Sequence, residues 1–270
     1  MSMEQYSNNK LRFGATYLLE NPTVDDAVSL CVQEALHFLE LNSNFPQCLL
    51  GSMRADRLKH LSQKHQIFYT LHLDDRFDPF DFNPHVSNAY IQTMLKGLAL
   101  AKEVGIPIIN MHIPRGNIVT LPSGRHYIYK EYPKEFEQNV LNFRSICEQN
   151  AGDKTRIAIE NTDGWENYEL VAIEMLLQSP VFGLTLDVGH DHATGNKDLA
   201  FFKKHKDRLL HMHLHDGWDN INHQTLGSGV IPLKERLGLA QSVNATVVVE
   251  TKTKAALHQS VEYLKDNGYL

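Results

Sequence analysis

Short apolar runs recur along this sequence, and most of them end in a carboxylate or a histidine. His72 closes FYTLH and His112 closes IINMH. The same holds later in the chain for Glu160 after IAI, Asp187 after LTL, His213 within LLHMHLH and Glu250 after VVV. In a parallel α/β barrel all strands end at one face, where side chains in this position converge. The pattern therefore predicts a barrel that carries a polar site at its C-terminal face.

Strand-like and helix-like segments alternate throughout the 270 residues. Eight such pairs in about 250 residues match the size of a closed (β/α)8 TIM barrel, which we expect as a single domain over residues 1–270. A doubly wound open sheet is the alternative, but it gathers its ligands at one switch point rather than on six strands. The expected strands are residues 11–17, 38–42, 67–73, 107–113, 156–161, 183–188, 209–215 and 245–251. The expected helices are residues 24–36, 54–64, 87–104, 134–149, 166–177, 197–205, 233–240 and 254–266, the first with a capping box from Thr23 to Asp26.

Side-chain alternation supports convergence of the polar residues on one cavity. Residues two apart on a strand share a face, so the positions before the strand-end residues also point inward. These inward positions are small or polar: Thr70, Asn110, Ala158, Thr185, His211 and Val248. The outward positions between them are large and apolar, as a layer under surrounding helices requires; they include Leu71, Met111, Leu186, Met212 and Val247.

Charge and cysteine content indicate which binding partners and which cellular compartment to expect. A formal net charge of −6 disfavours nucleic acid and anionic membranes as partners. The three cysteines are far apart and form no CxxC pair, which favours a reducing, cytoplasmic location. The start, MSMEQYSNNK, has no apolar stretch of the kind found in secretory signals, and no run is long enough to span a membrane.

Glu160, Asp187, His213 and Glu250 come from the expected fifth to eighth strands. Three carboxylates and one imidazole suit Mn²⁺, Zn²⁺, Co²⁺ or Fe²⁺ better than Ca²⁺. We therefore predict a divalent metal site formed by these four residues.

Other polar residues are candidates for a second metal or for substrate. His72 and His112 would complete a second metal position bridged by Glu160, or would donate hydrogen bonds to substrate oxygens. His190, three residues after Asp187, is expected on the turn above the strand end, where it contacts a substrate hydroxyl or phosphate. Glu40 points inward on the second strand and is expected to line the cavity.

The loop HQTLGSGVIPL, which starts at His223, follows the seventh strand. Gly227 and Gly229 permit close approach of the backbone, and exposed N–H groups there would hold a phosphate. The other interpretation of this short GxG is a plain turn.

These motifs resemble those of the xylose-isomerase-like TIM-barrel superfamily, which includes sugar-phosphate isomerases and epimerases and the family 2 apurinic endonucleases. The matching segments are IAIENTDG around Glu160, LDVGH around Asp187, HMHLHD around His213, LGSG at 226–229 and VVVET around Glu250. In the isomerase branch, the resemblance implies one cation held by the four predicted ligands. Glu160 and Glu250 would also move protons about a metal-stabilised enediolate, and His190 would contact the substrate.

The endonuclease IV-type branch implies a different function, zinc-dependent hydrolysis of abasic DNA. His72, His112, Glu160, Asp187, His190, His213, His223 and Glu250 all align with its ligand pattern. The chain departs from that pattern at Ile221, where the family has an aspartate on its third zinc. The segment after His112, IPRGNIVTLPSGRHYIYKEY, resembles a small-molecule lid rather than a DNA-intercalating loop.

The favoured hypothesis is therefore a metal-dependent isomerase or epimerase that acts on a sugar or sugar phosphate. The abasic-DNA phosphodiesterase is the alternative, and a barrel that binds sugar or metal without turnover is a third. Barrels of this kind often associate, so a homo-oligomer is also expected.

Overall fold

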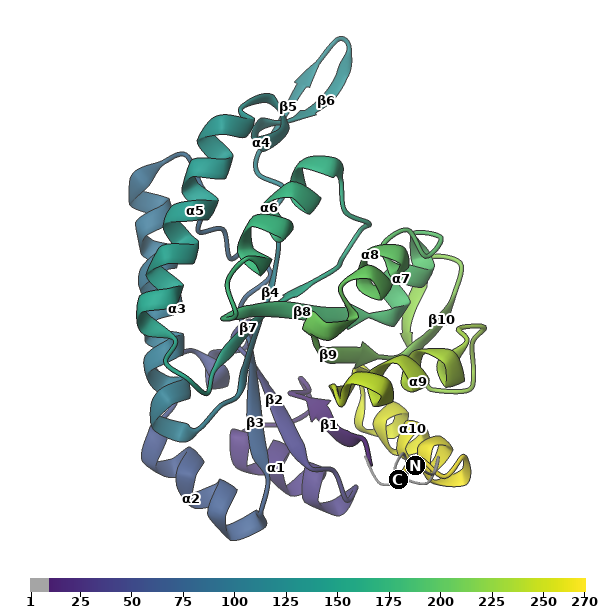
Figure 1. Ribbon diagram of the computed structural model, residues 1–270. Helices are drawn as coiled ribbons and strands as arrows, with labels where there is room; N and C mark the ends of the chain where they lie inside the picture. The colour runs from purple at the N-terminus through teal and green to yellow at the C-terminus, as the bar shows by residue number, and fades with distance from the viewer. Residues whose placement is uncertain (1–9) are drawn as a thin grey trace, which may run out of the picture.

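A computed structural model describes residues 10–270 of the chain, and in these residues eight parallel strands close into a barrel (Figure 1). The strands follow one another around the barrel in the order β1-β12-β9-β8-β7-β4-β3-β2. Their bounds are β1 (Arg12–Thr16), β2 (Phe38–Asn42), β3 (Phe68–His72), β4 (Ile108–His112), β7 (Arg156–Glu160), β8 (Phe182–Asp187), β9 (Leu209–Leu214) and β12 (Thr246–Val249). The predicted (β/α)8 barrel is confirmed, and every expected strand is present with ends that differ by at most two residues.

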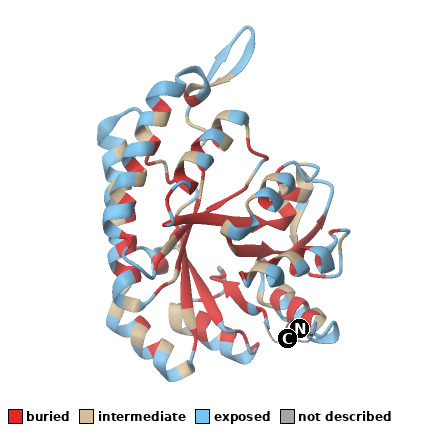
Figure 2. Cartoon of the chain, in the orientation of Figure 1, coloured by how far each residue is buried: buried red, intermediate tan, exposed pale blue. Residues whose placement is uncertain are grey.

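The helices that connect the strands lie outside the barrel. Figure 2 shows the strands buried at the centre, with exposed residues on the outer faces of the helices. The capping box of the first helix is present, because Thr23 Oγ1 accepts from Asp26 N at 3.2 Å. The helices are α1 (Val24–Gln33), α2 (Ala55–His65), α3 (Pro84–Val104), α5 (Pro133–Asn150), α6 (Asn167–Leu177), α8 (Leu199–Lys204), α9 (Leu233–Val243) and α10 (Lys254–Asp266).

The outward-facing strand residues form the core between barrel and helices. Leu71, Met111 and Val247 are all 0% exposed and belong to one hydrophobic cluster. Burial of a side chain of this size contributes about 1.5–3 kcal/mol. The inward positions Thr70 and Thr185 are also 0% exposed, so the polar residues fill the barrel interior as the alternation predicts.

Short secondary-structure elements follow the C-terminal ends of several strands. They include α7 (Val188–Ala193), directly after β8, and the hairpin of β10 (Asp216–Trp218) and β11 (Ile221–Gln224) after β9. One single turn of 3-10 helix, Pro46–Cys48, follows β2, and another, Lys206–Arg208, directly precedes β9.

The segment after His112 forms a hairpin of β5 (Ile118–Leu121) and β6 (Gly124–Tyr127), followed by α4 (Ile128–Glu131). Figure 1 shows this hairpin projecting beyond the ring of helices. All four residues of β5 are exposed, and the hairpin extends away from the body.

Within residues 10–270, no helix combines the length and the apolar character needed to cross a membrane. The expectation that the chain starts without a secretory signal concerns mainly residues 1–9, which lie outside the described part of the chain.

Candidate metal centre

The four predicted metal ligands meet at the C-terminal mouth of the barrel. Glu160 and Asp187 are the last residues of β7 and β8, His213 lies late in β9, and Glu250 follows β12 directly. The parallel register brings them level, since Asp187 pairs with His213 and His213 with Val248. One ligand atom from each of the four residues lies within 4.8 Å of the ligand atoms of the other three.

His213 lies at the centre of this group. Its Nδ1 is 3.0 Å from Oε1 of Glu160, 3.1 Å from Oε2 of Glu250 and 4.0 Å from Oδ2 of Asp187. Despite these short distances, neither ring nitrogen has a hydrogen bond of good geometry to any group in residues 10–270. Ligands about 2.1 Å from a divalent cation are about 3.0–3.4 Å from one another. The spacing around Nδ1 therefore fits a shared cation better than a set of hydrogen bonds.

The buried charges of the centre stabilise one another. Burial alone would raise the pKa of Glu160 and Glu250, but His213 lowers the pKa of both carboxyl groups well below the ordinary value. Burial would likewise raise the pKa of Asp187, which His215 and His190 lower. Burial opposes the charged form of His213, but Glu160 and Glu40 raise its pKa well above the ordinary value. A protonated His213 thus supplies, between the carboxylates, the positive charge that a cation would bring.

Glu160 also faces a second group of ligand atoms. Its Oε2 is 3.1 Å from Nε2 of His72 and 3.6 Å from Nε2 of His112, and it accepts a hydrogen bond from the Asn110 amide. His72, His112 and Asp75 form a further cluster with ligand atoms within 4.8 Å of one another. Glu160 consequently lies between two clusters, where a bridging carboxylate would be placed.

A third group surrounds the outer side of Asp187. The backbone N–H of His190, on α7, donates to Asp187 Oδ1 at 2.7 Å, and Nε2 of His215 lies 3.0 Å from the same oxygen. The backbone N–H of His223 donates to Nδ1 of His215 at 2.8 Å, and the two rings stack with centroids 4.3 Å apart. His223 has a left-handed backbone, with φ at 56°, and burial lowers its pKa to about 4. Ligand atoms of His215, His223 and Glu250 lie within 4.8 Å of one another.

A cavity of about 530 Å³ opens above these residues. Its volume is in the range of small-molecule sites. Lys252, at the rim, reaches Oε1 of Glu250 at 2.9 Å, and Asp75 accepts from the side chain of Asn44 at 2.8 Å. The lining comprises Asn42, Asn44, Phe45, His72, Asp75, His112, Glu160, Thr162, His190, His223, Glu250 and Lys252.

Several lining residues were not among the sequence predictions. Asn42 ends β2 and so follows the same strand-end rule as the predicted ligands. Asp75 and Lys252 each lie a few residues beyond a strand-end residue that was predicted, in the loops after β3 and β12. Extending the search by three residues past each strand end would have found both.

The prediction that the loop around Gly227 and Gly229 holds a phosphate is wrong, because its N–H groups already have an anionic partner. Oδ2 of buried Asp216 accepts from the backbone of Gly227 and Gly229, both at 3.0 Å, and Oδ1 accepts from Gly217 and Ile231. A Cβ on Gly229 would lie 2.3 Å from Asp216 Oδ1. Gly229 is thus required for the approach of an internal carboxylate, not of a ligand.

Glu40 does not line the cavity, contrary to the sequence prediction. It is 1% exposed and lies beneath the cluster, where its carboxylate contacts His211 and His213. The inward direction of its side chain was predicted correctly, but the residue lies one layer too deep to meet a substrate.

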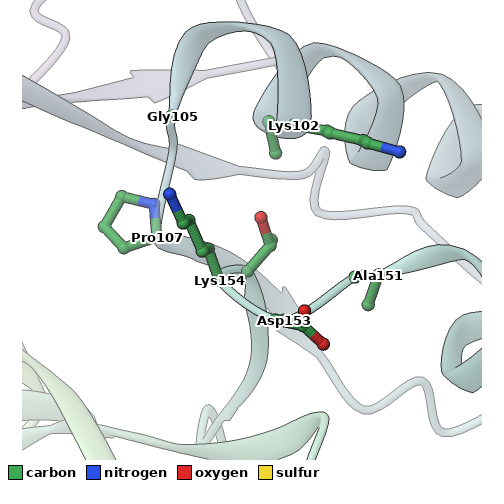
Figure 3. Close-up of a pocket in the computed structure, with 9 residues that line it drawn as sticks. Lys102, Gly105, Pro107, Ala151, Asp153 and Lys154 are labelled. Carbon is green, nitrogen blue, oxygen red and sulfur yellow. The ribbon is translucent and has the colours of Figure 1, made fainter.

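A second cavity, of about 540 Å³, lies at the other end of the barrel, beside the starts of β4 and β7. Figure 3 shows its wall, in which Lys102, Asp153 and Lys154 are the only charged residues. Its lining contains no histidine and one carboxylate, so it lacks a ligand set for a metal.

Carboxylates and histidines gather at the C-terminal mouth of this closed (β/α)8 barrel. The chain therefore falls in the class of (β/α)8 barrels with a candidate metal site at that mouth. Within that class, the chain belongs to the xylose isomerase-like TIM barrel family, whose sequence profile matches residues 39–267. The resemblance noted from the sequence motifs is therefore confirmed.

Solved structures show the same fold over nearly the whole chain. A D-tagatose 3-epimerase-like protein matches with a TM-score of 0.76 at 20% identity, covering 95% of this chain and 96% of that chain. D-psicose 3-epimerase from Clostridium cellulolyticum H10, solved with D-tagatose, matches with a TM-score of 0.75 at 13% identity, covering 96% and 99%. The IOLI protein with a bound zinc atom matches with a TM-score of 0.71 at 15% identity, covering 95% and 97%. A comparison with curated protein sequences finds no match.

Proposed function

We propose that this chain is a divalent-metal-dependent isomerase or epimerase of a small sugar. The observation that carries the proposal is the position of Glu160 and Glu250, whose oxygens lie 3.0 and 3.1 Å from the same nitrogen of His213 below an open cavity. The zinc atom of the IOLI structure and the epimerases among the similar structures support it. Zn²⁺ or Mn²⁺ is the proposed metal, with Co²⁺ or Fe²⁺ as alternatives, because the donor set is mixed carboxylate and imidazole.

Glu160, Asp187, His213 and Glu250 would hold the cation, which when bound would polarise the carbonyl and a neighbouring hydroxyl of the sugar. Glu160 ends β7 and Glu250 follows β12, two strands that are not neighbours in the barrel, so the two carboxylates approach the cavity floor from different sides. One carboxylate removes a proton from the carbon beside the carbonyl and the other returns a proton to it. His72, His112 and His190 line the same cavity and would orient sugar hydroxyls.

We propose that the loop at 226–231 does not bind a phosphate group of the substrate. Asp216 occupies the N–H groups that would bind one, and Lys252 at the rim is paired with Glu250. A polyhydroxy aldehyde or ketone suits a cavity lined by histidine, asparagine and carboxylate side chains.

We further propose that residues 1–270 act as one domain in a reducing, cytoplasmic compartment. Support comes from Cys31, Cys48 and Cys147, which are buried and unpaired. Self-association through the helical faces is part of the same proposal.

The test is proton exchange in deuterated water. Metal-loaded protein is incubated with a panel of ketohexoses, ketopentoses and the matching aldoses, and deuterium at each carbon is followed by NMR. We expect metal-dependent deuterium incorporation at one carbon beside the carbonyl, together with appearance of the epimer or isomer. Absence of exchange across the panel, with cleavage of abasic duplex DNA by the same preparation, would overturn the proposal.

Cleavage of abasic DNA is the alternative function because two further groups of ligand atoms surround the centre. One group is formed by His72, Asp75 and His112, and the other by His215, His223 and Glu250. They favour a zinc-dependent phosphodiesterase if each holds an ion. Ile221, where the endonucleases have an aspartate, is 47% exposed and offers no ligand. Elemental analysis separates the two functions: one metal per chain supports the isomerase, and two or three support hydrolysis.

A further inference from the structure

Glu40 is a buried carboxylate directly beneath the candidate metal centre. It lies on β2, across the barrel interior from β9, and each of its oxygens lies within 3.1 Å of a histidine ring nitrogen. Oε1 lies 2.9 Å from Nε2 of His213. Oε2 accepts from Thr70 Oγ1 at 2.9 Å and lies 3.1 Å from Nε2 of His211.

This arrangement is costly for a barrel interior, which is normally filled by branched apolar side chains. A buried carboxylate loses its hydration, and replacing a whole buried charged cluster by apolar residues of similar volume is often neutral or stabilising. The structure surrounds it with further polar groups, since Nδ1 of His211 lies 2.6 Å from Thr246 Oγ1. The cluster therefore calls for a role other than stability.

The role follows from the two nitrogens of His213. A metal-ligating histidine commonly directs the N–H of its other ring nitrogen toward a carboxylate or carbonyl, and the Glu40 carboxylate, which can only accept, lies 2.9 Å from Nε2. The other nitrogen, Nδ1, faces Glu160 and Glu250, so a cation held between these carboxylates would take the Nδ1 lone pair and leave the ring proton on Nε2. We propose that Glu40 is a positioning residue that fixes His213 in the tautomer with the proton on Nε2 and so presents Nδ1 to the metal. This inference rests on the proposed metal-dependent function.

The first test measures metal binding by calorimetry and by the visible absorption of Co²⁺. Glu40→Gln keeps the size of the side chain and removes its charge. We expect it to weaken Co²⁺ and Zn²⁺ binding by about tenfold to a hundredfold, as loss of such partners does elsewhere, and to change the Co²⁺ spectrum. Thr70→Val is the matched control, because it removes a hydrogen bond to the other oxygen of Glu40 without touching His213. We expect its affinity within about twofold of wild type.

Three results are informative. Unchanged metal affinity in Glu40→Gln, or equal losses in both variants, would overturn the positioning role while leaving the metal site intact. Wild-type protein that binds no metal would overturn this inference and the proposed function together.

A second measurement needs no substitution at Glu40. Wild-type protein with ¹⁵N-labelled histidine is loaded with Zn²⁺, and the ring signals of His213 are assigned by their loss in His213→Gln. We expect a proton on Nε2 and a metal-bound Nδ1. A metal-bound Nε2 would contradict the inference.

Discussion

The two ends of this barrel carry cavities of nearly equal size, about 530 Å³ at the C-terminal mouth and about 540 Å³ at the opposite end. Their chemistry differs entirely. The first is lined by histidines and carboxylates that end strands, and the second mainly by glycine, alanine, proline and lysine from helix ends and loops (Figure 3). Volume alone would not distinguish them.

The difference comes from how strands deliver side chains. At the C-terminal end, an inward-facing residue at or next to the end of several strands lies at the same height as those of the other strands, so polar groups converge. At the N-terminal end, the cavity lies between the C-terminal parts of α3 and α5, outside the barrel interior. A reaction centre is therefore expected at one end only, and each prediction below tests that asymmetry.

The largest effect is expected from Glu250→Gln. The change removes a carboxylate that would exchange a proton with the substrate, and general acid–base groups contribute about 10²–10⁴-fold to rate. We expect deuterium exchange and turnover of the responsive sugar to fall by that factor. Metal content is measured in parallel to separate a lost ligand from a lost base. Full turnover in this variant would show that the two-carboxylate mechanism is wrong.

Metal removal should destabilise the C-terminal mouth. A ligand present at 100 times its Kd stabilises the folded state by about 2.7 kcal/mol, which for a chain near this size corresponds to about 5–10 °C in Tm. We expect dialysis against a chelator to lower Tm by that amount and Mn²⁺ or Zn²⁺ to restore it. A Tm that changes neither with chelator nor with added metal would contradict a cation site at the C-terminal mouth.

The stability of the metal-free protein should depend on pH because of a histidine at the C-terminal mouth. Burial would lower the pKa of His72, but Glu160 raises it to about 9. This contribution to stability is fully present below the unfolded value of about 6.5 and is lost as pH rises through 9. We expect the free energy of unfolding to decline from pH 6.5 to 9, by at most about 1.4 kcal/mol per pH unit. His72→Gln should remove this part of the slope, as measured by urea unfolding at several pH values; an unchanged slope would contradict it.

The smallest effect is expected at the opposite cavity. Lys102 and Lys154 are exposed and have no role in the proposed chemistry. Replacing either by alanine should leave the free energy of unfolding within about 0.5 kcal/mol of wild type and the kcat/KM of the responsive sugar unchanged. A loss of activity in Lys154→Ala would mean that both ends serve the reaction.

The convergence of the ligands at the C-terminal mouth could be predicted because it depends on the local sequence of each strand. Alternation along each strand fixes which side chains point inward, and strand ends fix their height, so β2 was predicted with its observed bounds and Glu160, Asp187 and His213 with their observed convergence. Neither argument requires knowledge of which strands are neighbours.

What could not be predicted depends on contacts between distant segments. The partner of the Gly227 and Gly229 N–H groups is Asp216, and this pairing exists only once the β10–β11 hairpin folds back. The contact of Glu40 with His211 joins residues 171 apart and depends on the register of the closed barrel. The pairing of Asn44 with Asp75 links two loops in the same way.

The most direct test of the account is anomalous diffraction from crystals soaked in Mn²⁺ or Zn²⁺. We predict a strong anomalous peak about 2.0–2.3 Å from Nδ1 of His213 and within the same distance of oxygens from Glu160, Asp187 and Glu250. A metal bound elsewhere, or these four side chains directed apart with no peak between them, would contradict it.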